Sequence, residues 1–217
     1  MPALTGFARW PLTGLLAALA ACAPPPDAPL ADRLAHAAPS LSREVLDAAL
    51  EATACAQARG DVDGHALAVI DYTRPSVLQR LWLFNLDTGD VRRMLVAHGA
   101  ATGGLWATDF SNTPDSHQTS LGLFRGAEVY EGDHGRSLRL DGLEPGVNDA
   151  ARAREIVVHG ADYVSYSFIL RNGRLGRSWG CPAVPTDEAD ALVTALADGG
   201  ALFAWGEAAA PKSAACR

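Results

Sequence analysis

The stretch IVVHGADYVSYSFILRNGRLGRSWGCPAV, residues 156–184, ends an apolar run in His159 and sets Cys181 between a glycine and a proline. A nucleophilic cysteine needs a base or a cation nearby, because a free thiol is mostly protonated at neutral pH. It also needs amide donors for the oxyanion that forms on attack. Pro182 has no N–H, so these donors must be the amides of Gly180 or Cys181. The alternative is that Cys181 is a small hydrophobic side chain buried in a turn.

Short apolar runs separated by turn residues surround this stretch and predict a mainly β domain over residues 61–207. The predicted strands cover residues 66–72, 80–86, 91–99, 121–130, 137–141, 155–159, 164–170 and 201–206. Residues 87–90 predict a hairpin turn, and residues 99–120 a long loop. Two segments predict helices: 41–60, capped by Ser40 or Ser42, and 186–200, capped by Thr186.

The N-terminal residues 1–21 have the pattern of a signal peptide, with Arg9 followed by a short apolar run. This run ends in Leu-Ala-Ala-Cys and resembles the lipobox of bacterial lipoproteins, which implies a lipid on Cys22. Ala23 then implies sorting to the outer membrane. Residues 22–40 predict a flexible tether, because they are rich in proline and alanine without periodicity. Residues 208–217 predict a C-terminal tail.

Charge and cysteine content limit the function further. The chain has 217 residues and a net charge of −7, with no basic block, which argues against nucleic acid as a partner. Besides Cys22, three cysteines remain, and an odd number in an oxidising envelope predicts one pair and one free thiol. A bond between Cys55 and Cys216 would leave Cys181 free, but the sequence does not show that the two are close.

The stretch 156–184 resembles the catalytic segment of the murein L,D-transpeptidase (YkuD-like) family, whose signature is His-Gly followed by Ser/Thr-His-Gly-Cys. The segments LVAHG (95–99), FSNTPDSHQTSLG (110–122) and YEGDHGRSLRLDGLEPGVNDAAR (130–152) resemble the branch of that family with the ending GCPA. The resemblance implies a β-sandwich or barrel-like fold with two or three peripheral helices. It also implies an enzyme without cofactor or metal that acts on peptidoglycan tetrapeptide stems in the bacterial cell envelope.

The resemblance also implies roles for individual residues. Cys181 would be the nucleophile and His159 the general base, with the amides of Gly180 and Cys181 as oxyanion donors. Ser178 would form hydrogen bonds within the loop. The other implied residues would contact substrate: His134, Asn148 and Trp179 in the pocket, and Ser111, Asn112 and Ser116 on a loop over the cleft.

One position departs from the family signature, since Trp179 stands where the motif has histidine. His98 or His134 is a candidate to supply that imidazole from elsewhere. Three alternatives stay open beside the transpeptidase: an L,D-carboxypeptidase with water as acceptor, a non-catalytic wall-binding lipoprotein, and a zinc site. Zinc would need His98, His134, His159 and Cys181 together, but their separations match no short ligand pair.

Overall fold

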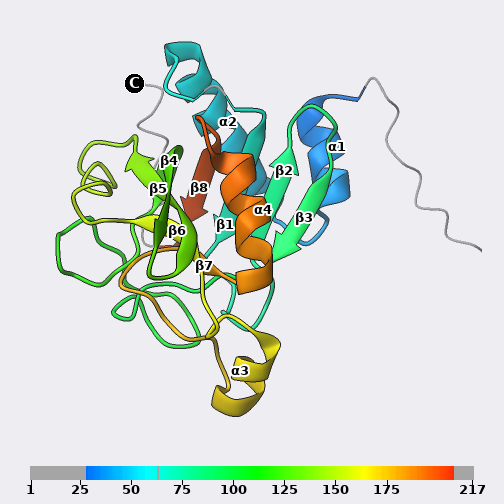
Figure 1. Cartoon of the computed structure of the whole chain (residues 1–217). Helices are drawn as coiled ribbons and strands as arrows, with labels where there is room; N and C mark the ends of the chain where they lie inside the picture. Colours follow the sequence, from blue (N-terminus) through cyan, green and yellow to red (C-terminus); the bar gives the residue numbers. More distant parts are fainter. Residues whose placement is uncertain (1–27, 63, 208–217) are drawn as a thin grey trace, which may run out of the picture.

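The computed structural model describes residues 28–62 and 64–207 (Figure 1). Its strands form a single sheet in the order β3-β2-β1-β8-β4-β5-β6-β7. The helices are α1 (Leu30–Ala37), α2 (Arg43–Arg59), α3 (Tyr166–Asn172) and α4 (Thr186–Leu196). The strands are β1 (Ala66–Asp71), β2 (Leu81–Asn85), β3 (Val91–Met94), β4 (Gly122–Gly132), β5 (Gly135–Gly142), β6 (Val157–Gly160), β7 (Ala183–Val184) and β8 (Ala201–Trp205).

Both faces of the sheet are covered, which explains why β8 is apolar throughout and β1 is apolar up to Ile70. Along β1, Leu67 and Val69 face the cluster that contains α1 and α2, whereas Ala68 and Ile70 face the cluster that contains α4. Helix α4 contacts β1, β4, β5 and β6, so the sheet curves around it (Figure 1). The predicted mainly β, sandwich- or barrel-like fold is therefore confirmed.

The number and place of the helices differ from the expectation of two or three peripheral ones. The described residues contain four, and α4 lies in the core through Ala189, Leu192, Val193 and Leu196. Helix α2 is confirmed, with the Ser42 hydroxyl accepting from the Val45 amide at 3.2 Å and Gly60 ending the helix at φ 76°. Thr186 is not a cap: it is the first residue of α4.

Two segments were wrongly predicted. Residues 30–37 fall in the expected tether but form α1, because the side chain of Leu34 is fully buried against α2 and the sheet. Residues 164–170 were expected to form a strand, but most of them lie in α3. The Ser165 hydroxyl caps this helix by accepting from the Phe168 amide at 3.3 Å, and Gly173 ends it at φ 70°. Local capping therefore overrides the β propensity of the aromatic and β-branched side chains.

Several predictions concern residues outside the described ranges: the signal peptide, the lipid site at Cys22, the C-terminal tail and Cys216. Cys55 on α2 is disulfide-bonded, while Cys181 is free. The pairing of Cys55 with Cys216 stays a prediction. Within the described ranges, none of the helices has the length and apolar character needed to cross a membrane.

Candidate active site

Strands β6 and β7 bring His159 and Cys181 to one cleft of about 620 Å³. The two strands are parallel, and His159 is paired with Ala183. Cys181 comes two residues before Ala183 and therefore lies beside Val157, whose amide faces the Cys181 sulfur at 3.5 Å. Residues 156–184 thus contribute both His159 and Cys181 to the cleft.

The His159 ring has a defined tautomer. Its Nδ1 lies 3.0 Å from the carbonyl oxygen of Gly160, and a carbonyl only accepts, so Nδ1 carries the hydrogen. Nε2 is then left as the basic nitrogen. Burial lowers the pKa of His159, the carbonyl of Gly160 partly opposes this, and the neighbouring His134 lowers the pKa further. The ring stacks on that of His134 at 4.4 Å between centroids. His159 is therefore a neutral imidazole, which can take a proton.

The Cys181 thiol is also neutral at rest. Burial raises its pKa above the ordinary 9.0, and the amide of Val157, the charge of Arg154 and the thiol's own backbone amide offset this only in part. The resting pair is consequently thiol and imidazole, not thiolate and imidazolium. A neutral thiol needs a base to become a nucleophile, and the neutral imidazole of His159 lines the same cleft.

Ser178 closes the turn that carries Cys181. Its hydroxyl donates to the carbonyl of Cys181 at 2.6 Å and accepts from the amide of Gly180 at 3.2 Å, as expected of a hydrogen-bonder within the loop. Gly180 has φ +122°, and a Cβ there would lie 2.8 Å from the carbonyl oxygen of Gln118. The amide of Gly180 is already bonded to the hydroxyl of Ser178 in this conformation.

Trp179 lies at the rim of the cleft and does not fill it. Its side chain is 73% exposed and stacks on the ring of His117, with centroids 4.8 Å apart and an interplanar angle of 7°. His117 could not be predicted from the sequence, because this contact joins the loop 99–120 to a turn about 60 residues further along the chain. His134 lines the cleft as expected.

His98 does not supply an imidazole to the cleft. It is buried, its Nδ1 accepts from the Arg80 guanidinium at 2.7 Å, and its Nε2 faces the carbonyl of Gly103 at 3.3 Å. Burial and Arg80 lower its pKa to about 4. The four candidate zinc ligands are thus not brought together, and the described part of the chain has no group of three or more His, Cys, Asp or Glu side chains arranged to hold a metal.

Three residues expected to contact substrate, Asn148, Asn112 and Ser111, are not among those that line the cleft. Asn148 is fully buried: its amide group donates to the carbonyls of Leu121 and Leu123, and its oxygen accepts from the amide of Glu144. Asn112 fastens the loop 99–120 to residues 149 and 150, and the carbonyl of Ser111 accepts from Arg154. A small polar side chain in a loop looks the same in sequence whether it faces substrate or backbone.

Arginines in the cleft were missed altogether. Arg139, Arg154 and Arg177 line it, against the acids Asp133 and Glu155. Arg139 stacks over the ring of Tyr130 at 4.8 Å. Nothing in the local sequence marks Arg139 and Arg154, because their place in the cleft depends on how segments far apart in the chain fold together.

Comparison with solved structures gives distant matches. An L,D-transpeptidase from Mycobacterium smegmatis is 15% identical at a TM-score of 0.40, over 65% of this chain and 59% of that one. One from Xylanimonas cellulosilytica is 16% identical at a TM-score of 0.39, over 66% and 61%. A Bdellovibrio bacteriovorus protein is 15% identical at a TM-score of 0.39, over 65% and 48%. The match thus spans about half to three fifths of the length of these proteins.

No curated protein matches the sequence. The family model described as L,D-transpeptidase catalytic domain, however, matches residues 37–205. This range contains the whole sheet, the cleft, His159 and Cys181. The chain belongs to the L,D-transpeptidase catalytic domain family.

Proposed function

We propose that this protein is a cysteine-dependent L,D-transpeptidase that acts on peptidoglycan tetrapeptide stems through a thioester at Cys181. The observation that carries the proposal is the placement of a free thiol and a neutral imidazole in one cleft, with the His159 tautomer held by the carbonyl of Gly160. Family membership supports the same reaction class.

In the acylation step, His159 Nε2 takes the proton of the Cys181 thiol. The sulfur then attacks the carbonyl carbon between stem residues three and four. The amide of Cys181 donates to the resulting oxyanion, and the amide of Gly180 joins it if it leaves Ser178. When the C–N bond breaks, the imidazolium protonates the departing amine of D-alanine. The product is a thioester between Cys181 and the tripeptide.

In the second step an amine of a neighbouring stem attacks the thioester and gives its proton to His159. The sulfur leaves as thiolate and takes the proton back, which restores the resting pair. The energy of the cleaved peptide bond is kept in the thioester, so the chemistry consumes no ATP. Water in place of the amine would make the enzyme an L,D-carboxypeptidase.

A non-catalytic wall-binding lipoprotein is the second candidate, because Trp179 replaces the motif histidine. Its ring is largely exposed and leaves both Cys181 and His159 in the cleft, which favours the enzyme. The place of action that we propose is the cell envelope, with a lipid on Cys22 anchoring the protein to the outer membrane on its periplasmic side. The lipobox-like pattern of residues 19–22 supports this anchor.

Purified tetrapeptide muropeptides test the proposal. The chain with Cys22→Ser, which cannot carry the lipid, is incubated with them and the products are analysed by mass. Cross-linked dimers that have lost one D-alanine support the transpeptidase, and tripeptides support the carboxypeptidase. Unchanged tetrapeptides with a folded protein contradict both. The matched control is Cys181→Ser in the same background, which should fold and give no product.

A further inference from the structure

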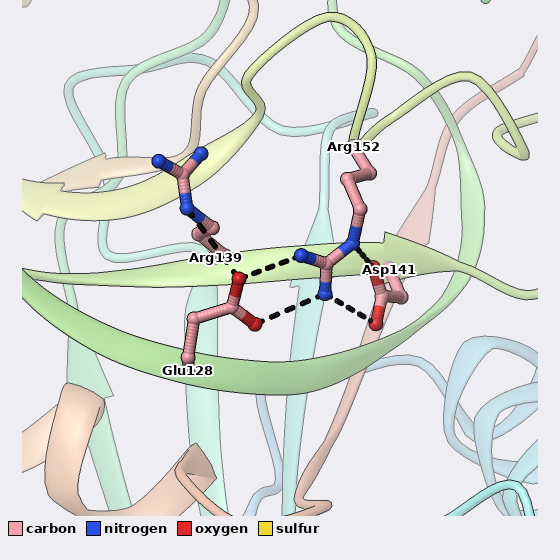
Figure 2. A network of polar contacts seen from close by, with 4 residues as sticks. All are labelled: Glu128, Arg139, Asp141 and Arg152. Carbon is pink, nitrogen blue, oxygen red and sulfur yellow. Dashed lines mark hydrogen bonds and ion pairs between the residues drawn. The ribbon is translucent and has the colours of Figure 1, made fainter.

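Two arginines in one short segment differ in how their charge is neutralised. Arg152 bonds the carboxylates of Glu128, at 2.6 and 3.0 Å, and Asp141, at 2.5 and 2.9 Å (Figure 2). Its side chain is exposed, and each of its terminal groups has an acidic partner. Arg154 lies two residues further along the chain, and no ion pair joins it to a carboxylate among the residues described.

The partners of Arg154 are all neutral oxygens. Nη1 donates to the carbonyl of Ser111 at 2.7 Å and to the hydroxyl of Ser120 at 2.5 Å. Nη2 donates to the hydroxyl of Ser116 at 3.2 Å and to the carbonyl of Gln118 at 2.5 Å. These four bonds use all four protons of the terminal nitrogens and fix the plane of the guanidinium against the loop 99–120.

The fixed guanidinium lies beside the nucleophile. Arg154 lines the same cleft as Cys181, and a Cβ added to the neighbouring Gly180 would lie 3.2 Å from Nη2. The side chain is half-buried, and a cation removed from water without a counter-ion is costly. Burial lowers the pKa of Arg154, and Cys181 is the group that opposes this effect. The site therefore holds a positive charge whose natural counter-ion is absent while the thiol is protonated.

We propose that Arg154 is a positioning residue: its own guanidinium is held beside Cys181 and stabilises the thiolate that forms when His159 removes the proton. The proposal rests on the proposed function only in taking Cys181 as the nucleophile. It adds a second task for the guanidinium: by bonding the loop 99–120, Arg154 holds that loop against the turn of the nucleophile. The negative charge on the sulfur exists only after Cys181 loses its proton. The attraction to Arg154 therefore stabilises the reacting thiolate and not the resting thiol.

Other charged and titratable groups face or couple to Cys181 and must stay constant in the test. On its own segment these are Glu155, whose carbonyl lies 3.7 Å from the sulfur, and His159. From the hairpin of β4 and β5 they are Asp133, His134 and Arg139, and from other elements Tyr72, Tyr163 and Arg177. None of these residues is changed in the variants below.

The test is the pH profile of Cys181 alkylation by iodoacetamide, read by peptide mass in the full chain with Cys22→Ser. An opposite charge nearby shifts a pKa by about 1–3 units. Arg154→Met should therefore move the midpoint to higher pH by about 1 unit and slow alkylation at pH 7 about tenfold. Arg154→Lys keeps the charge and should recover most of the rate. Arg152→Met removes a charge that carboxylates already neutralise, so its profile should match the parent.

Arg154→Gln covers the case in which Arg154→Met does not fold, because an amide still donates to part of the loop. A midpoint in the Gln or Met variant equal to that of Arg152→Met overturns the proposal. So does a Lys variant that is as slow as Gln, since the charge is then irrelevant. Alkylation needs no stem peptide, so a shifted midpoint without muropeptide turnover would refute the proposed function alone. Turnover with an unshifted midpoint would refute only the role of Arg154.

Discussion

Replacing His159 with glutamine tests whether this residue is the base. Burial raises the pKa of the Cys181 thiol and lowers the pKa of His159. Without the base, only thiol that ionises on its own can react. At pH 7 a thiol with a pKa of 9 is about 1% thiolate, so kcat/KM should fall by at least about 10²-fold, or about 2.7 kcal/mol in barrier.

The pH dependence of this loss is the sharper part of the prediction. In the variant, kcat/KM should rise about tenfold per pH unit up to the pKa of Cys181, because the thiolate fraction does. The parent should instead be nearly flat above neutral pH. Its acidic limb should lie below pH 6.5, because activity requires neutral His159 and burial lowers the pKa of that group.

The assay is loss of D-alanine from tetrapeptide muropeptides between pH 5.5 and 9.5, with folding checked by circular dichroism at each pH. His65→Gln is the matched control, because His65 is exposed and lies outside the cleft. A loss of less than threefold at pH 7 would refute the reasoning. So would a loss of the same size at every pH, because it would show that His159 does not act by removing the thiol proton.

Three further predictions concern the frame of the site. Gly180→Ala should lower the free energy of unfolding by about 1–3 kcal/mol and abolish turnover, because alanine is strained at φ +122° and its Cβ would meet the carbonyl of Gln118; Gly173→Ala, at φ +70° with open space around it, should lower the melting temperature but keep turnover. Between pH 7 and pH 4 the free energy of unfolding in urea should fall by about 3 kcal/mol because of His98, and His98→Gln should remove this decrease. The reason is that His98 binds a proton below pH 6.5 in the unfolded state but only at about pH 4 when it is buried in the folded state. An equal decrease in both proteins would contradict this. Ser178→Ala should lower the free energy of unfolding in urea by about 1–3 kcal/mol and slow turnover, because it leaves the buried amide of Gly180 without a partner. Unchanged stability would show that the turn does not depend on the hydroxyl of Ser178.

Sequence alone predicted the parts of the fold that depend on local pattern. The apolar runs of β1, β2 and β8, the hairpin turn at residues 87–90 and the caps of α2 follow from alternation and turn chemistry. Helix α3 was missed because its side chains have strand propensity while its cap and its glycine end decide the conformation. Helix α1 was missed because it is short and its stability comes from burial of Leu34 against other elements.

In the candidate site too, the sequence predicted what depends on local pattern and not what depends on contacts between distant segments. His159 and Cys181 were found because both lie in one motif-like stretch, and the strand pairing confirms that they share a cleft. Asn148 was assigned to the pocket from motif order, although each of its polar atoms is bonded to backbone. Arg154 and His117 were not predicted from the sequence, because their contacts join segments that are far apart along the chain. A side chain's partners across the fold are not encoded in its neighbours along the chain.

The most direct test of the central claim is the mass of the peptide that contains Cys181, measured during turnover. The chain with Cys22→Ser is mixed with tetrapeptide muropeptide, quenched in acid within seconds and digested for peptide mapping. The account predicts a mass increase equal to the muropeptide minus one D-alanine, carried by the peptide that contains Cys181 and lost on treatment with hydroxylamine. D-alanine release with no such adduct, or with the adduct unchanged in Cys181→Ser, would contradict a thioester at Cys181.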